Sequence, residues 1–463
     1  MLNINGLPPE ILSLIFMSFY QDLKGGEVDI GLAAICLTCK HWNDLALSTP
    51  ELRSSIEIIS DPIHTLPISI LPSYFKVSTW LDRSQNWPLS LAVRGEQLNP
   101  IEFTSIKPIL PLLVAHSHRW RRLSLGFGFW FQPMHFHLPH TFIAPILESV
   151  EVICDSHLWD HIFHGRLLRG CPALRSYTSN QRGNYLTELP FDDLPWEQLS
   201  NLEVTNPTTA TNALMLLERA VNLHSCCLTI GLDLTTGRHS LKPVTSPIKF
   251  LTMNIHGGLG YGRDAKIFFR SLDACNLTSL SIGLLLGHSI THGILFDILS
   301  KPRLRLSSLT IGNLAISEDG FLECLTLVSE SITTLEILGM SEGPFYGAVR
   351  NNIIKLVTFH GEGSPKPLFP FLETLALELC VGADDGLLAR MVRSRRHSPR
   401  TLRDHGIALL KRVDVVFGHS THRLDEEGLK EMYGEGLRGH VKFQLKNRAR
   451  STITYSRCWP EYE

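Results

Sequence analysis

Three histidines recur at helical spacing in the segment HLWDHIFH. His157, His161 and His164 are four and three residues apart, so on a helix they would share one face. Imidazole nitrogens placed in this way can bind zinc. However, no glutamate stands beside a histidine, as it does in the His-Glu-x-x-His helix of zinc proteases. We therefore expect an ordinary helix face here and no metal centre.

The remaining histidine and cysteine patterns have structural explanations. HFHLPH at 135–140 contains a proline and predicts a loop. Cys36 and Cys39 form a Cys-x-x-Cys pattern on the apolar face of a predicted helix, where free cysteines usually act as small buried side chains. Cys226 and Cys227 are adjacent on a predicted strand, so one should point inward and the other outward.

Glycine-rich and nucleophile motifs do not indicate an enzyme. HGGLGYGRD at 256–264 lacks the Gly-x-Gly-x-x-Gly spacing of dinucleotide sites and predicts a loop between a strand and a helix. The sequence has no Gly-Lys-Ser/Thr phosphate loop and no Gly-x-Ser-x-Gly elbow. We expect a protein without catalytic residues, metal or cofactor.

Composition limits the classes of partner. The chain has 463 residues, a net charge of -2 and 19% charged residues, and leucine is about one residue in six. This near-neutral chain has no global field that would favour nucleic acid or an anionic membrane as its main partner. The N-terminus lacks a basic segment before its apolar stretch, and no apolar run is long enough to span a bilayer. We expect a cytoplasmic or nuclear protein, or one found in both compartments.

Two helices are expected near the N-terminus. In residues 7–20, proline stands at the helix start and a set of apolar residues shares one helical face: Ile11, Leu12, Ile15, Phe16 and Phe19. A polar stretch at 21–31 precedes a second apolar periodicity over 32–45, which predicts one further helix. A third short helix is expected to begin at Pro50, and an apolar, strand-like run follows at 56–59.

Beyond residue 80 the pattern apolar-x-x-apolar-x-apolar recurs. Its six clear instances begin at Leu199, Ile248, Leu277, Leu306, Ile332 and Leu372. Weaker instances begin at Trp120, Leu147, Leu174, Leu223, Ile353 and Leu410. The mean spacing is about 26 residues, within the period of leucine-rich repeats. Apolar helical stretches lie between them, for example at 213–222, 267–275 and 321–330, so we expect a solenoid with a parallel sheet.

An arginine-rich segment interrupts the last repeat step. Residues 390–403, RMVRSRRHSPRTLR, contain six arginines and no acidic residue. Further basic residues follow at the C-terminal end: Arg438, Lys442, Lys446, Arg448 and Arg450. We expect 390–403 to be an exposed loop, with nucleic-acid contact as the alternative, because clustered arginines can also neutralise phosphate.

The first 59 residues resemble a known motif. LPPEIL, then IF, then LTCKHW followed by Leu45-Ala46 resemble the F-box. Segments such as TWLDRSQNWPLSLAV (79–93) and HRWRRLSL (118–125) resemble those of fungal F-box proteins with degenerate leucine-rich repeats.

This resemblance implies an α/β fold with an N-terminal three-helix F-box and a curved parallel sheet that carries helices on its convex face. The implied domains are an F-box at 1–59, a solenoid at 60–445 with the basic insertion at 390–403, and a tail at 446–463. The implied function is substrate recognition for an SCF ubiquitin ligase, with an unknown protein substrate on the repeats. The alternative is a scaffold that acts without the ligase.

The resemblance also implies a binding site for a Skp-type adaptor, which would connect the chain to a cullin-RING ligase. The implied adaptor-binding residues are Leu7, Pro8, Ile11, Leu12, Ile15, Phe16, Cys39 and Trp42.

Overall fold

The computed structural model describes most of the chain and divides it into two compact units, Met1–Asn206 and Pro207–Glu463. The described residues are 6–21, 27–59, 71–95, 98–128, 130–140, 142–155, 161–182, 194–231, 242–256, 262–285, 292–312, 316–339, 348–361, 363–396, 399–418 and 422–443. None of the helices in these ranges combines the length and the apolar composition that crossing a membrane requires.

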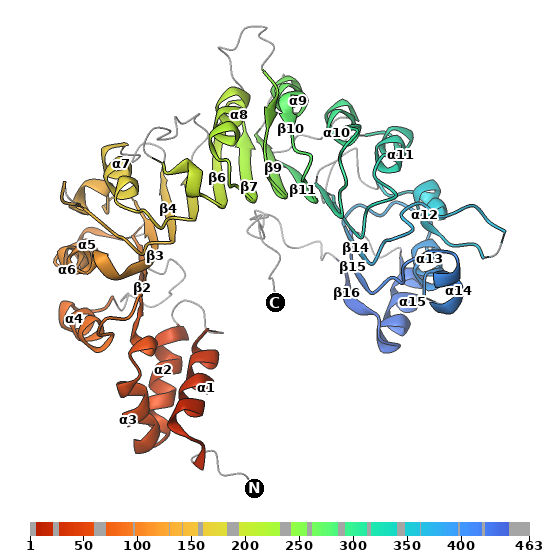
Figure 1. Ribbon diagram of the computed structural model, residues 1–463. Helices are drawn as coiled ribbons and strands as arrows, with labels where there is room; N and C mark the ends of the chain where they lie inside the picture. The colour runs from red at the N-terminus through yellow and green to blue at the C-terminus, as the bar shows by residue number, and fades with distance from the viewer. Residues whose placement is uncertain are drawn as a thin grey trace. The chain divides into compact units, whose positions relative to one another are not determined.

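The first unit begins with short helices (Figure 1). They are α1 (Pro9–Gln21), α2 (Glu27–Thr38), α3 (Lys40–Ser48) and the 3-10 turn η2 (Pro50–Arg53). The expectation of one helix over 32–45 is wrong, because Cys39 is extended (φ -163°, ψ 167°) and separates α2 from α3. Its Sγ accepts a hydrogen bond from the backbone N–H of Trp42 (3.5 Å), so the Cys-x-x-Trp sequence forms an N-cap.

A parallel sheet follows directly. Its strands pair in chain order: β1 (Ser55–Ile59), β2 (Leu89–Arg94), β3 (Trp120–Gly126), β4 (Ser149–Asp155), β5 (Ser176–Arg182) and β6 (Asn201–Thr208). The connecting helices are α4 (Tyr74–Arg83), α5 (Pro100–Ile106), α6 (Ile109–Ala115) and α7 (His161–Arg169). Because β1 pairs with β2, the apolar run at 56–59 belongs to the sheet. The expected division into a separate domain at 1–59 stays a prediction.

The second unit continues the strand-helix alternation. Its parallel strands are β7 (Ser225–Ile230), β9 (Phe250–His256), β11 (Ser279–Leu285), β12 (Ser308–Gly312), β13 (Thr334–Leu338), β14 (Thr374–Glu378), β15 (Arg412–Phe417) and β16 (Arg438–Phe443). Its helices are α8 (Ala210–Arg219), α9 (Gly262–Ser271), α10 (His292–Leu299), α11 (Glu318–Thr326), α12 (Asn351–Val357), α13 (Leu387–Ser394), α14 (Pro399–Asp404) and α15 (Arg423–Gly434). A small parallel pair is formed by β8 (Val244–Thr245) and β10 (Leu272–Asp273). Within this unit the helices lie on the convex side of the sheet (Figure 1).

The repeat pattern predicts most strands correctly. All six clear instances coincide with strands, and their second apolar residues stack across the sheet: Leu251 lies opposite Leu280, Leu280 opposite Leu309, and Leu309 opposite Leu335. These leucines are buried, whereas their neighbours on the strands are half-buried. In these strands one face therefore builds the core and the other forms a half-buried, mostly polar surface.

Two expectations in this region are wrong. Ile353 does not begin a strand but lies in α12, where Ile353, Ile354 and Val357 share a buried helical face. Cys226 and Cys227 are both buried, so the second face of β7 is covered as well.

The expectation of an exposed loop at 390–403 is also wrong. Residues 390–394 belong to α13 and residues 399–403 to α14. Met391 and Val392 are buried between the arginines, and the Arg395 side chain is itself fully buried. The long step between Leu372 and Leu410 therefore contains two helices, and the arginines that remain exposed lie on their outer surface.

The described structure ends with β16, which pairs with β15 and has mostly exposed side chains. Arg438 and Lys442 of the expected basic cluster lie on this strand, while Lys446, Arg448, Arg450 and the expected tail at 446–463 lie outside the described residues.

Candidate functional site

The first histidine pattern lies mostly outside the described residues. His157 lies outside the described residues, as do the side chains of His161 and His164, although these two belong to helix α7. In the expected loop at 135–140, His135 Nδ1 accepts a hydrogen bond from the Gln132 N–H (3.1 Å). Burial lowers the pKa of His135, so its neutral form is favoured as this acceptor. Much of the glycine-rich segment, 257–261, is also outside the described residues.

A polar cluster that the sequence analysis missed lies at the start of α15. Asp385, His422 and Asp425 each have a possible ligand atom within 4.8 Å of the others. Their carboxylate oxygens already accept hydrogen bonds: Asp385 from the N–H groups of residues 424 and 425, and Asp425 from Ala389 N–H (2.8 Å). His422 Nδ1 lies 3.1 Å from the Asp425 carboxylate. These contacts attach α15 to α13, and the cluster has a structural role.

The cysteines of the described residues are free thiols. Burial raises the pKa of Cys171 to about 12 and that of Cys324 to about 11, so both thiols stay protonated at neutral pH. Cys36 and Cys39 are half-buried rather than buried, and Cys39 is the N-cap of α3. The expectation that both lie on the apolar face of one helix is therefore wrong.

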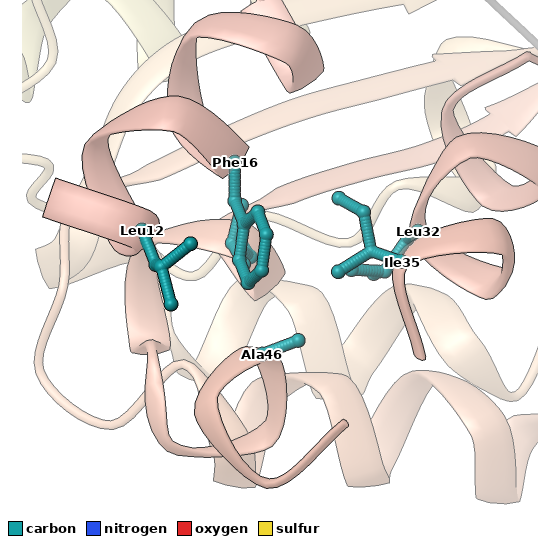
Figure 2. Close-up of a cluster of buried hydrophobic side chains, with 6 residues drawn as sticks. Leu12, Phe16, Leu32, Ile35 and Ala46 are labelled. Atoms are coloured by element: carbon teal, nitrogen blue, oxygen red, sulfur yellow. The ribbon is translucent and has the colours of Figure 1, made fainter. Parts of the chain in front are cut away.

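The N-terminal helices enclose a small apolar core. Six residues from α1, α2, α3 and η2 form it: Leu12, Phe16, Leu32, Ile35, Ala46 and Leu52. Figure 2 shows Leu12 and Phe16 on one side, Leu32 and Ile35 on the other, and Ala46 pointing between them. Leu7, Met17, Cys36, Trp42 and Leu45 pack against this core and are partly buried.

Trp42 connects α3 to α1 at the edge of this core. Its ring centroid lies 4.9 Å from that of Phe16, and the two planes are tilted by 58°. Near the far end of α3, the hydroxyls of Ser13 and Thr49 lie 3.4 Å apart, and Thr49 Oγ1 donates to Leu45 O (2.8 Å). These contacts hold the inner side of α1 against α3, while the outer side of α1 stays uncovered.

That outer side of α1 is apolar. Ile11, Leu14, Ile15 and Phe19 are 43%, 65%, 41% and 45% exposed. Positions three and four apart lie next to one another on a helix, so the four side chains form one strip, here called the α1 strip. Leu37 on α2 is a further exposed apolar residue, at 85%. Contiguous exposed apolar surface of this kind is typical of a protein-binding site.

The structure divides the eight residues expected to contact an adaptor. Pro8, Ile11 and Ile15 are exposed, and Leu7, Cys39 and Trp42 are half-buried. Leu12 and Phe16 are 0% and 2% exposed, so these two build the core of the domain rather than a surface that a partner could reach. Leu14 and Leu37 are exposed apolar residues that the sequence analysis did not name, because both lie outside its apolar periodicities.

Comparison with known families agrees with this geometry. Residues 4–57 match the F-box-like family. The chain carries an F-box-like domain. Such domains generally bind Skp-type adaptors, and they do so as part of SCF ubiquitin ligases. A search of curated proteins found no match to the chain.

Proposed function

We propose that this chain is the substrate-recognition subunit of an SCF (Skp-cullin-F-box) E3 ubiquitin ligase. The observation that carries the proposal is the α1 strip, which lies on an F-box-like domain whose core is completed by other residues. Complete burial of an exposed apolar side chain contributes about 1.5–3 kcal/mol, and each of these half-exposed side chains contributes the corresponding part of it on adaptor binding. Ile11, Ile15, Leu14 and Phe19 are the main contacts in this proposal, with Pro8 and Trp42 beside them.

The remaining chain is proposed to hold a protein substrate. Its strand-helix units have the apolar spacing of degenerate leucine-rich repeats like those of fungal F-box proteins, and the polar faces of their strands offer an extended binding surface. The receptor would contribute proximity to the ubiquitin-charged subunits and no chemistry of its own. Free thiols suit a reducing compartment, which supports the cytoplasm or the nucleus as its location.

The test is a double substitution in the α1 strip, Leu14→Asp with Ile15→Asp. Two carboxylates that become buried against the adaptor are expected to lower its affinity at least about 100-fold, because unpaired buried charges cost several kcal/mol. Co-purification of the full chain with a Skp-type adaptor measures this effect. Both positions are exposed in the free chain, so circular dichroism is expected to show an unchanged fold.

Phe75→Asp is the matched control. Phe75 lies on α4 and is 80% exposed, so it adds a charge to an apolar surface residue of the same unit outside the F-box-like domain. It is expected to leave adaptor binding unchanged. Equal binding by the wild-type chain and the double variant would refute the proposed contact. A folded wild-type chain that binds no adaptor would favour the scaffold that acts without the ligase.

A further inference from the structure

We infer that the exposed face of β2, β3 and β4 binds an acidic side chain of a protein substrate, with the guanidinium of Arg122 as its main contact. This inference rests on the proposed function in that it gives the substrate receptor a specific site and a substrate chemistry.

The site is a hollow of about 220 Å³ over β1 to β4, and Leu91 and Leu123 contribute to its lining beside the polar residues. Its polar lining includes Glu57, Ser90, Arg122, Ser149 and Glu151. Ala92 is the small residue at its floor. Ala92 lies between Glu57 of β1 and Ser124 of β3 in the strand register. Because its side chain ends at Cβ, the sheet is recessed at this point.

A β-bulge places Arg122 in this hollow. Trp120 lies opposite Leu89 and Arg122 lies opposite Ser90, so Arg121 is an extra residue in β3. Bulges redirect side chains and are common beside functional sites. The extra residue, Arg121, is paired with Glu148 (2.9 Å). Arg122, by contrast, is exposed and has no hydrogen-bond or ion-pair partner in the described part of the chain.

Serine residues lie beside Arg122 on both neighbouring strands. Ser90 of β2 and Ser149 of β4 are the direct register partners of Arg122. An arginine with five N–H donors and two neighbouring hydroxyls forms a donor set that suits an anion. Carboxylates bind guanidinium groups through two parallel hydrogen bonds, which gives both affinity and orientation.

The two glutamates of the hollow favour a singly charged ligand. Glu151 is neutralised by Arg94 (2.8 Å) and accepts a hydrogen bond from the Ser124 hydroxyl (2.5 Å), so it leaves Arg122 unpaired. Glu57 interacts within the chain and lies on β1, two strands away from Arg122. A doubly charged phosphate would be repelled by both carboxylates, and Arg122 is the single unpaired cation that would attract it. An Asp or Glu side chain carries one negative charge, which the single charge of Arg122 balances. The proposed ligand is therefore an aspartate or glutamate on an extended segment.

The experiment is a display selection of random nine-residue peptides on the immobilised full chain, without adaptor. Selected peptides are expected to be enriched in Asp or Glu at one position. Arg122→Gln is expected to weaken the best of them at least tenfold, and Arg122→Glu to shift the selection toward Lys or Arg. Arg121→Gln is the matched control, because it removes the neighbouring arginine and is expected to leave peptide affinity unchanged.

Three results would overturn the inference. They are no acidic enrichment on the wild-type chain, acidic peptides whose affinity is unaffected by Arg122→Gln, and at least tenfold tighter binding when phosphoserine replaces the selected acidic residue. Adaptor co-purification of the Arg122 variants is measured in parallel and is expected to be unchanged. Because the selection uses no adaptor, failure of the peptide site and failure of the SCF proposal are seen in separate measurements.

Discussion

Arg395 is a charged residue in the interior of the second unit. Its side chain is fully buried, and its Nη atoms donate to the carbonyl oxygens of residues 357, 368, 369 and 370 at 2.8–3.4 Å. Burial lowers the pKa of Arg395 to about 10, which still leaves the guanidinium charged at neutral pH. Arg119 in the first unit is similar, with donation to the carbonyls of residues 81, 84 and 87. Both arginines bind backbone carbonyl groups that lie 25 or more residues earlier in the chain.

Substitution of Arg395 is expected to destabilise the fold strongly. Arg395→Met removes the donors and leaves four buried carbonyls without this partner, so we expect the free energy of unfolding to fall by about 3 kcal/mol or more. Urea denaturation of the purified chain measures this change. Arg393→Met is the control, because Arg393 is exposed and pairs with Glu431 at the surface, where such pairs contribute up to about 1 kcal/mol. Equal losses in the two variants would show that the buried network adds no stability.

At the scale of elements, α13 shows why arginine content alone does not predict a loop. Leu388, Met391 and Val392 form its buried side, and Arg390 and Arg393 lie on its exposed side. This is an ordinary amphipathic helix with arginine as its polar residue. Helix α1 differs from α13 in this respect: one side builds the core, and the exposed side is apolar instead of polar.

Trypsin is expected to cut slowly after Arg390 and Arg393 of α13 in the native chain. A protease needs an extended segment, and α13 is held by its buried side and by Arg395. Mass spectrometry of a short digestion checks this, and the Arg395→Met variant should be cut here much sooner. Early cleavage of the wild-type chain after Arg390 or Arg393 would mean that α13 is not stably folded.

At the scale of the whole molecule, stability is expected to be shared between neighbouring repeats. Leu309 of β12 lies between Leu280 of β11 and Leu335 of β13, so these strands of the second unit build their core together. The F-box-like domain has its own apolar core of six residues in the other compact unit. A destabilising substitution in one repeat of the second unit should therefore affect the adjacent strands of that unit and leave α1 to α3 folded.

Leu309→Asp tests this expectation. Leu309 is fully buried on β12, so a carboxylate there should cost several kcal/mol and unfold β11 to β13 together. Hydrogen exchange followed by mass spectrometry should show lost protection in these strands and retained protection in α1 to α3. Ser281→Asp on the polar face of β11 is the control, with an expected change below about 0.5 kcal/mol. Loss confined to β12, or equal effects of both variants, would contradict cooperation between repeats.

Local patterns in the sequence determined much of this architecture. The spacing Leu-x-x-Leu-x-Ile places alternate residues of a strand in the core, and the expected parallel strands with intervening helices are present. The start of α1 at Pro9 and the apolar periodicity of α1 are equally local. The match of residues 4–57 to the F-box-like family agrees with the motif LPPEIL and LTCKHW.

Tertiary structure decided the points that depend on partners far away in the chain. Leu12 and Leu14 look alike in sequence, yet α2 and α3 cover the first and leave the second exposed. Arg395 is buried because carbonyls 25 to 38 residues earlier in the chain accept its hydrogen bonds. Arg122 and Ser149 become neighbours only through strand pairing. Burial and proximity are properties of the packed chain, because each depends on which distant residues come to lie against a given side chain.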